Sequence, residues 1–216
     1  MIPVERIEKP LILTKYADQW LKTLKEIKAN PNSTKQQINN AINKYNHKEI
    51  RQALITMFNG KCAYCERKIE RGRIEHFKPK SHYIDLTFDW NNFLYSCEVC
   101  NDKGHKGDKF PIDNNGNQLL INPRDENCDV YQHLEFVYQD KLATVKTKDQ
   151  QGDITEDIFK LNRIDLKEHR SKKVKHLLTM FNIAKDDNRE AMQILKESCQ
   201  LDSEYMTFTL FYIIPY

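Results

Sequence analysis

The sequence KCAYCERKIERGRIEHFKPKSHYIDLTFDWNNFLYSCEVCNDKGHKGDKFP, from Lys61 to Pro111, contains most of the motifs on which the fold prediction rests. It contains two Cys-x-x-Cys pairs separated by 31 residues, and their members are Cys62, Cys65, Cys97 and Cys100. Two such pairs are a typical ligand set for structural Zn²⁺, which is held tetrahedrally by four thiolates. We therefore predict a zinc ion that joins the two cysteine pairs, which we call the first and the second knuckle.

Three further side chains in this stretch are not needed as zinc ligands. Glu75 and His76 lie between the knuckles, and Asn101 directly follows the second one. A neutral imidazole is a suitable general base near pH 7, and carboxylate and amide oxygens can hold a hard cation such as Mg²⁺. Four thiolates close the zinc ion to a substrate. We therefore expect zinc to hold the frame and these three residues to carry the chemistry.

The adjacency of Glu75 and His76 imposes a geometric condition. Neighbouring side chains on a regular strand point to opposite faces, so both can serve one site only where the strand end bends. Pro79 makes an irregular end plausible, because proline lacks the amide donor that a strand needs. Each residue also has a structural alternative: Glu75 could form a salt bridge to Lys78 or Arg73, and His76 could be a strand histidine bonded to backbone.

The composition suits a soluble globular protein. The 216 residues are 39% hydrophobic and 30% charged, with only seven prolines and six glycines. The chain opens without a signal-like apolar segment and has no stretch of membrane-spanning length, so we expect a cytoplasmic protein with no membrane partner. Thiols stay reduced in that compartment, which favours metal binding over disulfides for the paired cysteines. Cys128 and Cys199 are predicted to be small apolar side chains.

The local charge is more informative than the net charge of +3. Residues 61–83 hold seven Lys or Arg against three Glu, a modest electrostatic footprint for a polyanion or simply a solvated hairpin surface. The candidate phosphate contacts are Lys78, Lys80, Lys103 and Lys106.

The N-terminal part of the chain predicts three helices. The first covers residues 15–29 after a cap at Thr14, and the second follows the Ser-Thr pair at 33–34. The third and clearest covers residues 47–58 and stops at Gly60, a residue suited to the left-handed position after a helix. This third helix leads straight into the first knuckle and is expected to aim it.

The central part predicts short strands and turns. Residues 73–77 form a strand candidate, and a helix is expected to begin over residues 90–95. The apolar run at 119–121 is strand-like, and the alternation at 134–138 and 142–145 predicts a hairpin.

The C-terminal part predicts three more helices. The first has its cap at Asp153 or Thr155, the second at Asp165, and the third covers residues 186–200. The apolar, aromatic segment 205–216 is too short to span a membrane, and we expect it to be buried, with a partner surface as the alternative.

Taken in order, these residues resemble the HNH, or ββα-metal, nuclease superfamily. There a hairpin bears an acidic residue followed by His, and a helix bears the last metal ligand. The resemblance makes His76 the general base and Asn92 the brace of the loop that carries this histidine. It makes Glu75 and Asn101 the holders of a catalytic Mg²⁺ or Mn²⁺ ion. Glu75 stands where many members have Asp, and Asn101 matches a His-Asn-Asn variant of the pattern.

Further motifs resemble those of one HNH subfamily. They are Gly60–Glu66 (GKCAYCE), Ile74–Lys80 (IEHFKPK), Ser96–Asn101 (SCEVCN), Lys106–Pro111 (KGDKFP), Asn122-Pro123, Leu134–Phe136 (LEF) and Leu161–Arg163 (LNR). This subfamily comprises the PtuB-like nucleases of Septu-type antiphage systems, which also accompany some retrons. The spacer between Asn101 and Lys106 is longer here than in that pattern.

The subfamily resemblance implies a defence effector whose partner is a PtuA-like ATPase. In retron-associated members the partners would include a retron reverse transcriptase and its msDNA. We expect the substrate to be DNA, because water attacks phosphorus in HNH chemistry and no 2′-OH is needed. Two alternatives stay open: an RNA-cleaving effector, for example one that cuts tRNA, and a non-catalytic zinc-clipped module that binds nucleic acid or protein.

The predicted fold class is α+β and mostly helical. A small zinc-clipped ββα-metal core is expected over residues 61–111. Residues 1–60 are expected to form a helical region that packs on this core and could contact a partner, and residues 112–216 a C-terminal hairpin and helical region.

Overall fold

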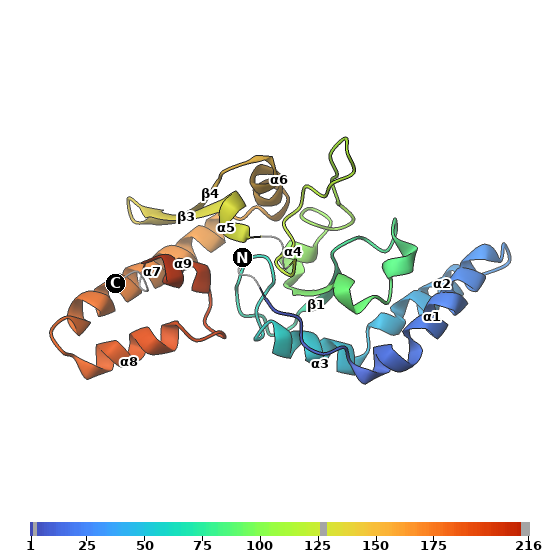
Figure 1. The fold of residues 1–216 in the computed structure, drawn as a ribbon, viewed down its shortest axis with the longest axis horizontal. Helices are drawn as coiled ribbons and strands as arrows, with labels where there is room; N and C mark the ends of the chain where they lie inside the picture. Colours follow the sequence, from blue (N-terminus) through green and yellow to red (C-terminus); the bar gives the residue numbers. More distant parts are fainter. Residues whose placement is uncertain (2–3, 126–128, 213–216) are drawn as a thin grey trace.

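The computed structural model describes residues 1, 4–125 and 129–212 (Figure 1). Its helices are α1 (Leu11–Ala29), α2 (Lys35–Ile42), α3 (Lys48–Met57), α4 (Glu98–Asn101), α5 (Val130–His133), α6 (Gln150–Phe159), α7 (Ile164–Ala184), α8 (Arg189–Ser198) and α9 (Met206–Tyr212). The strands are β1 (Arg73–His76), β2 (Phe93–Ser96), β3 (Leu134–Gln139) and β4 (Leu142–Thr147), and short 3₁₀ turns are η1 (Asn43–Tyr45), η2 (Ile84–Leu86) and η3 (Trp90–Asn92). The predicted mostly helical α+β class is confirmed.

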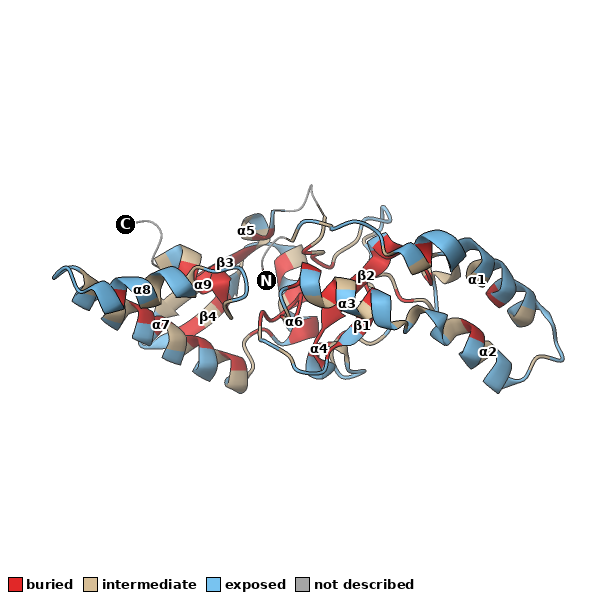
Figure 2. Cartoon of the chain, turned by 90° about the horizontal axis from the view of Figure 1, so that it is seen from below, coloured by how far each residue is buried: buried red, intermediate tan, exposed pale blue. Residues whose placement is uncertain are grey.

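The elements lie along one long axis. The β1–β2 hairpin and α4 occupy the middle, α1 and α2 extend to one end, and α7 and α8 extend to the other (Figure 1). Buried residues gather around the middle, whereas α2 and α8 are largely exposed (Figure 2). The core therefore lies where the hairpin, α3 and α6 meet.

The N-terminal helices follow the prediction except at one boundary. Helix α1 begins at Leu11, before the predicted cap at Thr14, because the carbonyl of Pro10 already accepts the amides of Leu13 and Thr14. Helix α2 is capped by Thr34 in a reciprocal arrangement with Gln37, as expected.

Helix α3 aims the first knuckle, as predicted. Its buried face carries Ile50, Leu54 and Met57. After it, Asn59 and Gly60 both adopt positive φ values, of 52° and 68°. These left-handed residues turn the chain sharply out of the helix.

The prediction of a helix from residue 90 was wrong. Only the single turn η3 is helical, and β2 then pairs antiparallel with β1, so that Glu75 faces Leu94 and His76 faces Phe93 across the ladder. All four residues of β2 are buried. A short run that is apolar on both faces has no periodicity that separates a strand from a helix, so pairing with β1 decides it.

The C-terminal hairpin β3–β4 is confirmed, with its turn at Asp140 and Lys141. The strand predicted at 119–121 is absent from the described residues. The amide of Ile121 instead donates to the side chain of Thr155, 3.0 Å away, so this segment is bonded to α6 and not to another strand.

The C-terminal helices begin at residues other than those expected. Helix α6 is capped by Asp149, whose carboxylate accepts the amide of Gly152 at 2.8 Å. A Cβ atom at Gly152 would lie 2.3 Å from the carbonyl oxygen of His133, so this position needs glycine. Helix α7 begins after Arg163, and α8 begins after Asn188, which caps it.

Helix α9 buries much of the apolar C-terminal segment. Tyr205 to Thr209 are buried, as expected, while residues 213–216 lie outside the described residues. The main-chain amide and the hydroxyl of Thr207 both donate to the carboxylate of Glu66, in the first knuckle. Cys199 is half-buried, and Cys128 also lies outside the described residues. Among the described helices none is long and apolar enough to cross a bilayer.

Candidate functional site

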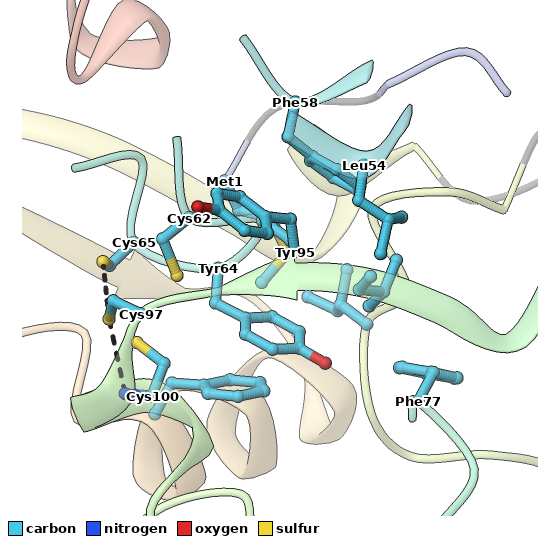
Figure 3. Close-up of a cluster of buried hydrophobic side chains, with 14 of the residues drawn as sticks. Met1, Leu54, Phe58, Cys62, Tyr64, Cys65, Phe77, Tyr95, Cys97 and Cys100 are labelled. Carbon is cyan, nitrogen blue, oxygen red and sulfur yellow. Dashed lines mark hydrogen bonds between the residues drawn. The ribbon is translucent and has the colours of Figure 1, made fainter. Parts of the chain in front are cut away.

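The four paired cysteines form one cluster beside the β1–β2 hairpin. Their sulfur atoms all lie within 4.8 Å of one another, and the Sγ atoms of Cys65 and Cys97 are 3.8 Å apart (Figure 3). Zinc–thiolate bonds of about 2.3 Å in a tetrahedron place sulfur atoms about 3.8 Å apart. The donor set and its spacing therefore fit a structural Zn²⁺ ion.

Local backbone geometry produces this cluster. In the first knuckle the amide of Cys62 donates to the carbonyl of Arg67, and Glu66 takes a positive φ of 63° to close the turn. In the second knuckle Cys97 caps α4, and its Sγ accepts the amide of Cys100 at 3.4 Å. Amide donors that point at sulfur stabilise the thiolate form that zinc requires.

A polar cleft of about 450 Å³ brings together Glu75, His76 and Asn101, the residue that follows Cys100. Glu75 and His76 both reach this cleft although they are neighbours on β1. The remaining lining residues are Tyr45, Asn46, Arg51, Arg73, Ile74, Pro79, Lys80, Glu98, Asp102, Lys103, Gly107 and Asp108.

His76 is held in a defined orientation. Its Nε2 atom lies 2.9 Å from the carbonyl oxygen of Thr87, and edges of its ring meet Tyr45 and Phe93 at centroid distances of 4.6 and 5.0 Å. A carbonyl oxygen only accepts, so Nε2 carries the proton and Nδ1 carries the lone pair. Burial lowers the pKa of His76 to about 3, and the positive charge of Lys80 acts in the same direction. The imidazole is therefore neutral at pH 7.

Glu75 is buried beside two partners. Asn101 donates from Nδ2 to Oε2 of Glu75, and the ammonium of Lys106 lies 3.2 Å from Oε1. Burial raises the pKa of Glu75 to about 7, an effect that the charges of Lys106 and Lys80 only partly oppose. This carboxylate, with its oxygen atoms in a confined pocket, is a suitable cation ligand.

The predicted phosphate contacts fall into different environments. Lys103 is exposed at the rim of the cleft, and half-buried Lys80 lines it with its ammonium over the ring of Tyr45. Lys78 lies over Tyr83 and Phe110, away from the lining. The fully buried Lys106 differs from the prediction: it pairs with Glu75 and is not a surface contact for phosphate.

Asn92 joins the two ends of the loop that follows β1. Its Oδ1 accepts the amide of Lys78 at 2.8 Å, and its Nδ2 donates to the carbonyls of Lys78 and Leu86 at 2.9 and 3.2 Å. The loop so held includes Thr87, the partner of His76.

Part of the cleft wall comes from the N-terminal helical region, a placement that no sequence motif predicted. Tyr45 belongs to η1, and Arg51 belongs to α3, where its guanidinium donates to Gly72 and Asn46. Neither residue lies in a motif of the core, so only the packing of α3 against β2 reveals them.

The knuckle region and most of the whole chain are similar to known proteins. Residues 62–107 match the family model described as HNH endonuclease, a range that holds both knuckles, Glu75, His76 and Asn101. The chain is also 31% identical over 224 residues to Septu protein PtuB of Bacillus mycoides (strain KBAB4), and the alignment covers 90% of this chain and 71% of that protein. The chain belongs to the PtuB family. This PtuB-family chain therefore contains an HNH endonuclease domain.

Two further relatives extend the comparison. A Septu protein PtuB from Bacillus thuringiensis is 36% identical over 123 residues, which are 54% of this chain and 42% of that protein. Septu protein PtuA of Bacillus mycoides (strain KBAB4) is 29% identical over 180 residues, covering 69% of this chain but 24% of PtuA. A segment similar to this PtuB-family chain thus occurs within a longer PtuA chain.

In this PtuB-family site, replacing Asn92 with alanine is expected to displace His76 indirectly. Loss of the three hydrogen bonds should loosen the loop that includes Thr87 and slow cleavage by up to about 100-fold, the cost of a misplacement near 1 Å. The free energy of unfolding should fall by about 2 kcal/mol. Cleavage rates and thermal unfolding would be measured beside Asn91→Ala, an exposed neighbour. Normal cleavage by a destabilised Asn92→Ala protein would contradict the role of Asn92 in bracing the loop that carries His76.

Proposed function

We propose that this protein is a metal-dependent endonuclease that hydrolyses phosphodiester bonds of DNA. It would act as the effector of a Septu antiphage complex with a PtuA-like ATPase, in the cytoplasm. The observation that carries this proposal is the convergence of an oriented neutral imidazole, a buried carboxylate and an amide in one polar cleft.

His76 is the proposed general base. The Thr87 carbonyl fixes the tautomer, so Nδ1 is free to take a proton from water as it attacks phosphorus. A pKa near 3 makes a weak base, but a phosphate in the cleft brings negative charge close to the imidazole and shifts its pKa upward. Proton uptake is thus favoured where the substrate is bound.

Glu75 and Asn101 are the proposed holders of a Mg²⁺ or Mn²⁺ ion. Oε1 of Glu75 is buried 3.2 Å from the ammonium of Lys106, and the carboxylate also faces the Tyr64 side chain, so a cation held by Glu75 would share this oxygen with Lys106. The Asn101 amide points its nitrogen towards the carboxylate, and half a turn of the amide would present its oxygen to a cation. A divalent ion held there would stabilise charge on the phosphate oxygens and on the departing oxygen.

The alignment with the longer PtuA chain supports a PtuA-like partner. A segment that is part of PtuA in one protein would be expected to act together with PtuA where it forms a separate chain. Lys80, Lys103 and Arg51 line the cleft and are the proposed contacts for a polyanionic substrate, whereas Arg73 is paired with Glu98.

The decisive experiment is reconstitution of the zinc-loaded protein with its PtuA-like ATPase. DNA and RNA panels, tRNA included, would be incubated with and without Mg²⁺ and nucleotide. Mg²⁺-dependent cutting of DNA supports the proposal, whereas cutting of RNA alone would show that the substrate is RNA and not DNA. Binding without cutting in every arm would favour a non-catalytic module.

Metal binding at Glu75 is expected to depend on pH. Only the carboxylate form binds a cation, and a pKa of about 7 means that the protonated fraction grows as pH falls below 7. Mn²⁺ should therefore bind about tenfold more weakly at pH 6 than at pH 8. Titration calorimetry on zinc-loaded protein measures this, and Glu75→Gln should remove both the binding and its pH dependence. Equal affinity at the two pH values would contradict Glu75 as the ligand.

A further inference from the structure

The Leu-Asn-Arg motif at residues 161–163 joins the C-terminal region to the zinc cluster. Asn162 lies between α6 and α7, where its side chain accepts the amide of Val145 at 2.8 Å and donates to the carbonyl of Val145 at 2.7 Å. It therefore fixes the motif to β4. The next residue, Arg163, points the other way, and its Nη1 donates to Sγ of Cys100 at 3.9 Å and to the carbonyl of Phe159 at 3.0 Å.

Asp165 connects Arg163 to the other knuckle. Its Oδ1 atom lies 3.0 Å from Nε of Arg163, and its Oδ2 atom lies 3.0 Å from Nη1 of Arg67. Arg67 in turn accepts the amide of Cys62 with its carbonyl. The chain of contacts Arg67, Asp165, Arg163 therefore runs from the first knuckle to a sulfur atom of the second.

The environment makes this contact electrostatically important. A zinc ion with four thiolates carries a net charge of −2, and the cysteines are buried. Buried negative charge is costly unless N–H donors and cations compensate it. The Arg163 side chain is only 14% exposed, so its attraction to the thiolate is weakly screened.

We propose that Arg163, oriented by Asp165, is a positioning residue of the zinc centre that stabilises the Cys100 thiolate and slows the loss of zinc. The C-terminal region is then part of the metal site, although all four ligands lie between residues 62 and 100. The inference concerns zinc retention and does not depend on nuclease activity.

A purely structural role for Arg163 makes a different prediction. Its bond to Phe159 and its place at the start of α7 could simply support the fold. In that case its replacement would lower thermal stability but leave the zinc–sulfur bonds unchanged. Zinc release and the spectrum of the Co²⁺-substituted protein distinguish the two roles.

The test compares the full zinc-loaded chain with three variants in excess chromophoric chelator. Arg163→Gln is expected to release zinc about tenfold faster, the lower end of the effect of such supporting residues on metal affinity. Arg163→Lys, which keeps the charge but lacks the planar fork, should be intermediate, and Asp165→Asn should show a smaller increase. The control is Lys172→Gln, which removes an exposed cation from the same helix and should leave release unchanged.

Co²⁺ substitution adds an absorption spectrum that reports on the metal–sulfur bonds and does not change when only the stability of the fold is lowered. The thiolate-to-cobalt charge-transfer bands should shift in Arg163→Gln, because Cys100 loses an N–H donor. Wild-type release together with wild-type bands would overturn the proposal. If Arg163→Gln does not fold, Arg163→Lys and Asp165→Asn carry the test, and wild-type release by both would overturn it.

Discussion

Replacing His76 with alanine is expected to slow nucleic-acid cleavage by about 10²–10⁴-fold. The structure leaves one lone pair, on Nδ1, to accept a proton from water, since Nε2 is bonded to Thr87. Alanine removes that acceptor and also opens a space beside Tyr45 and Phe93. The measurement is the single-turnover cleavage rate of the reconstituted complex in saturating Mg²⁺.

The matched control for His76→Ala is His82→Ala. His82 lies six positions later in the chain and is exposed, so the His82→Ala variant should cleave at the wild-type rate. Circular dichroism and zinc content should be unchanged in both variants, which separates loss of the base from loss of the fold. An undiminished cleavage rate in His76→Ala would remove this site from the nuclease proposal.

The second large effect is expected for Cys97→Ser. Cys97 Sγ lies 3.8 Å from Sγ of Cys65 and also accepts the amide of Cys100, so it contributes to both knuckles. A serine hydroxyl is a poor zinc ligand. Structural zinc contributes on the order of 10 kcal/mol to folding, which is comparable with the whole stability of a domain. We therefore expect the variant to lose zinc and its cooperative unfolding transition.

Cys199→Ser is the control for this experiment. Cys199 is half-buried at the end of α8 and is not a member of the cysteine cluster. Its replacement should leave zinc content, measured by mass spectrometry, and the thermal transition unchanged. A folded, active and zinc-free Cys97→Ser protein would contradict a structural role for the metal.

The parts of the molecule that could be predicted from sequence are those set by local chemistry. Cysteine spacing specifies the knuckles, and Thr34 with Gln37 specifies the start of α2. The stop after α3 follows from the left-handed tendency of Gly60. In each case the relevant partners lie within a few residues, or the metal itself selects the residue type.

The parts that could not be predicted depend on distant partners. Strand β2 exists because β1 pairs with it, and the bonds of Ile121 depend on Thr155, 34 residues away. Lys106 had the appearance of a surface lysine, yet the backbone returns so that its amide bonds to Cys100, and its ammonium reaches Glu75. No local pattern in the sequence encodes that return.

The burial of Lys106 has a thermodynamic consequence for the order of assembly. Its ammonium already balances the carboxylate of Glu75, so a divalent cation would bring two uncompensated positive charges into a confined space. A phosphodiester carries the opposite charge and offsets part of that excess. Nucleic acid and metal should therefore bind synergistically, each raising the affinity for the other by the same factor. Such reciprocity would make cation binding weaker in the protein alone and stronger once the strand that is to be cut is bound.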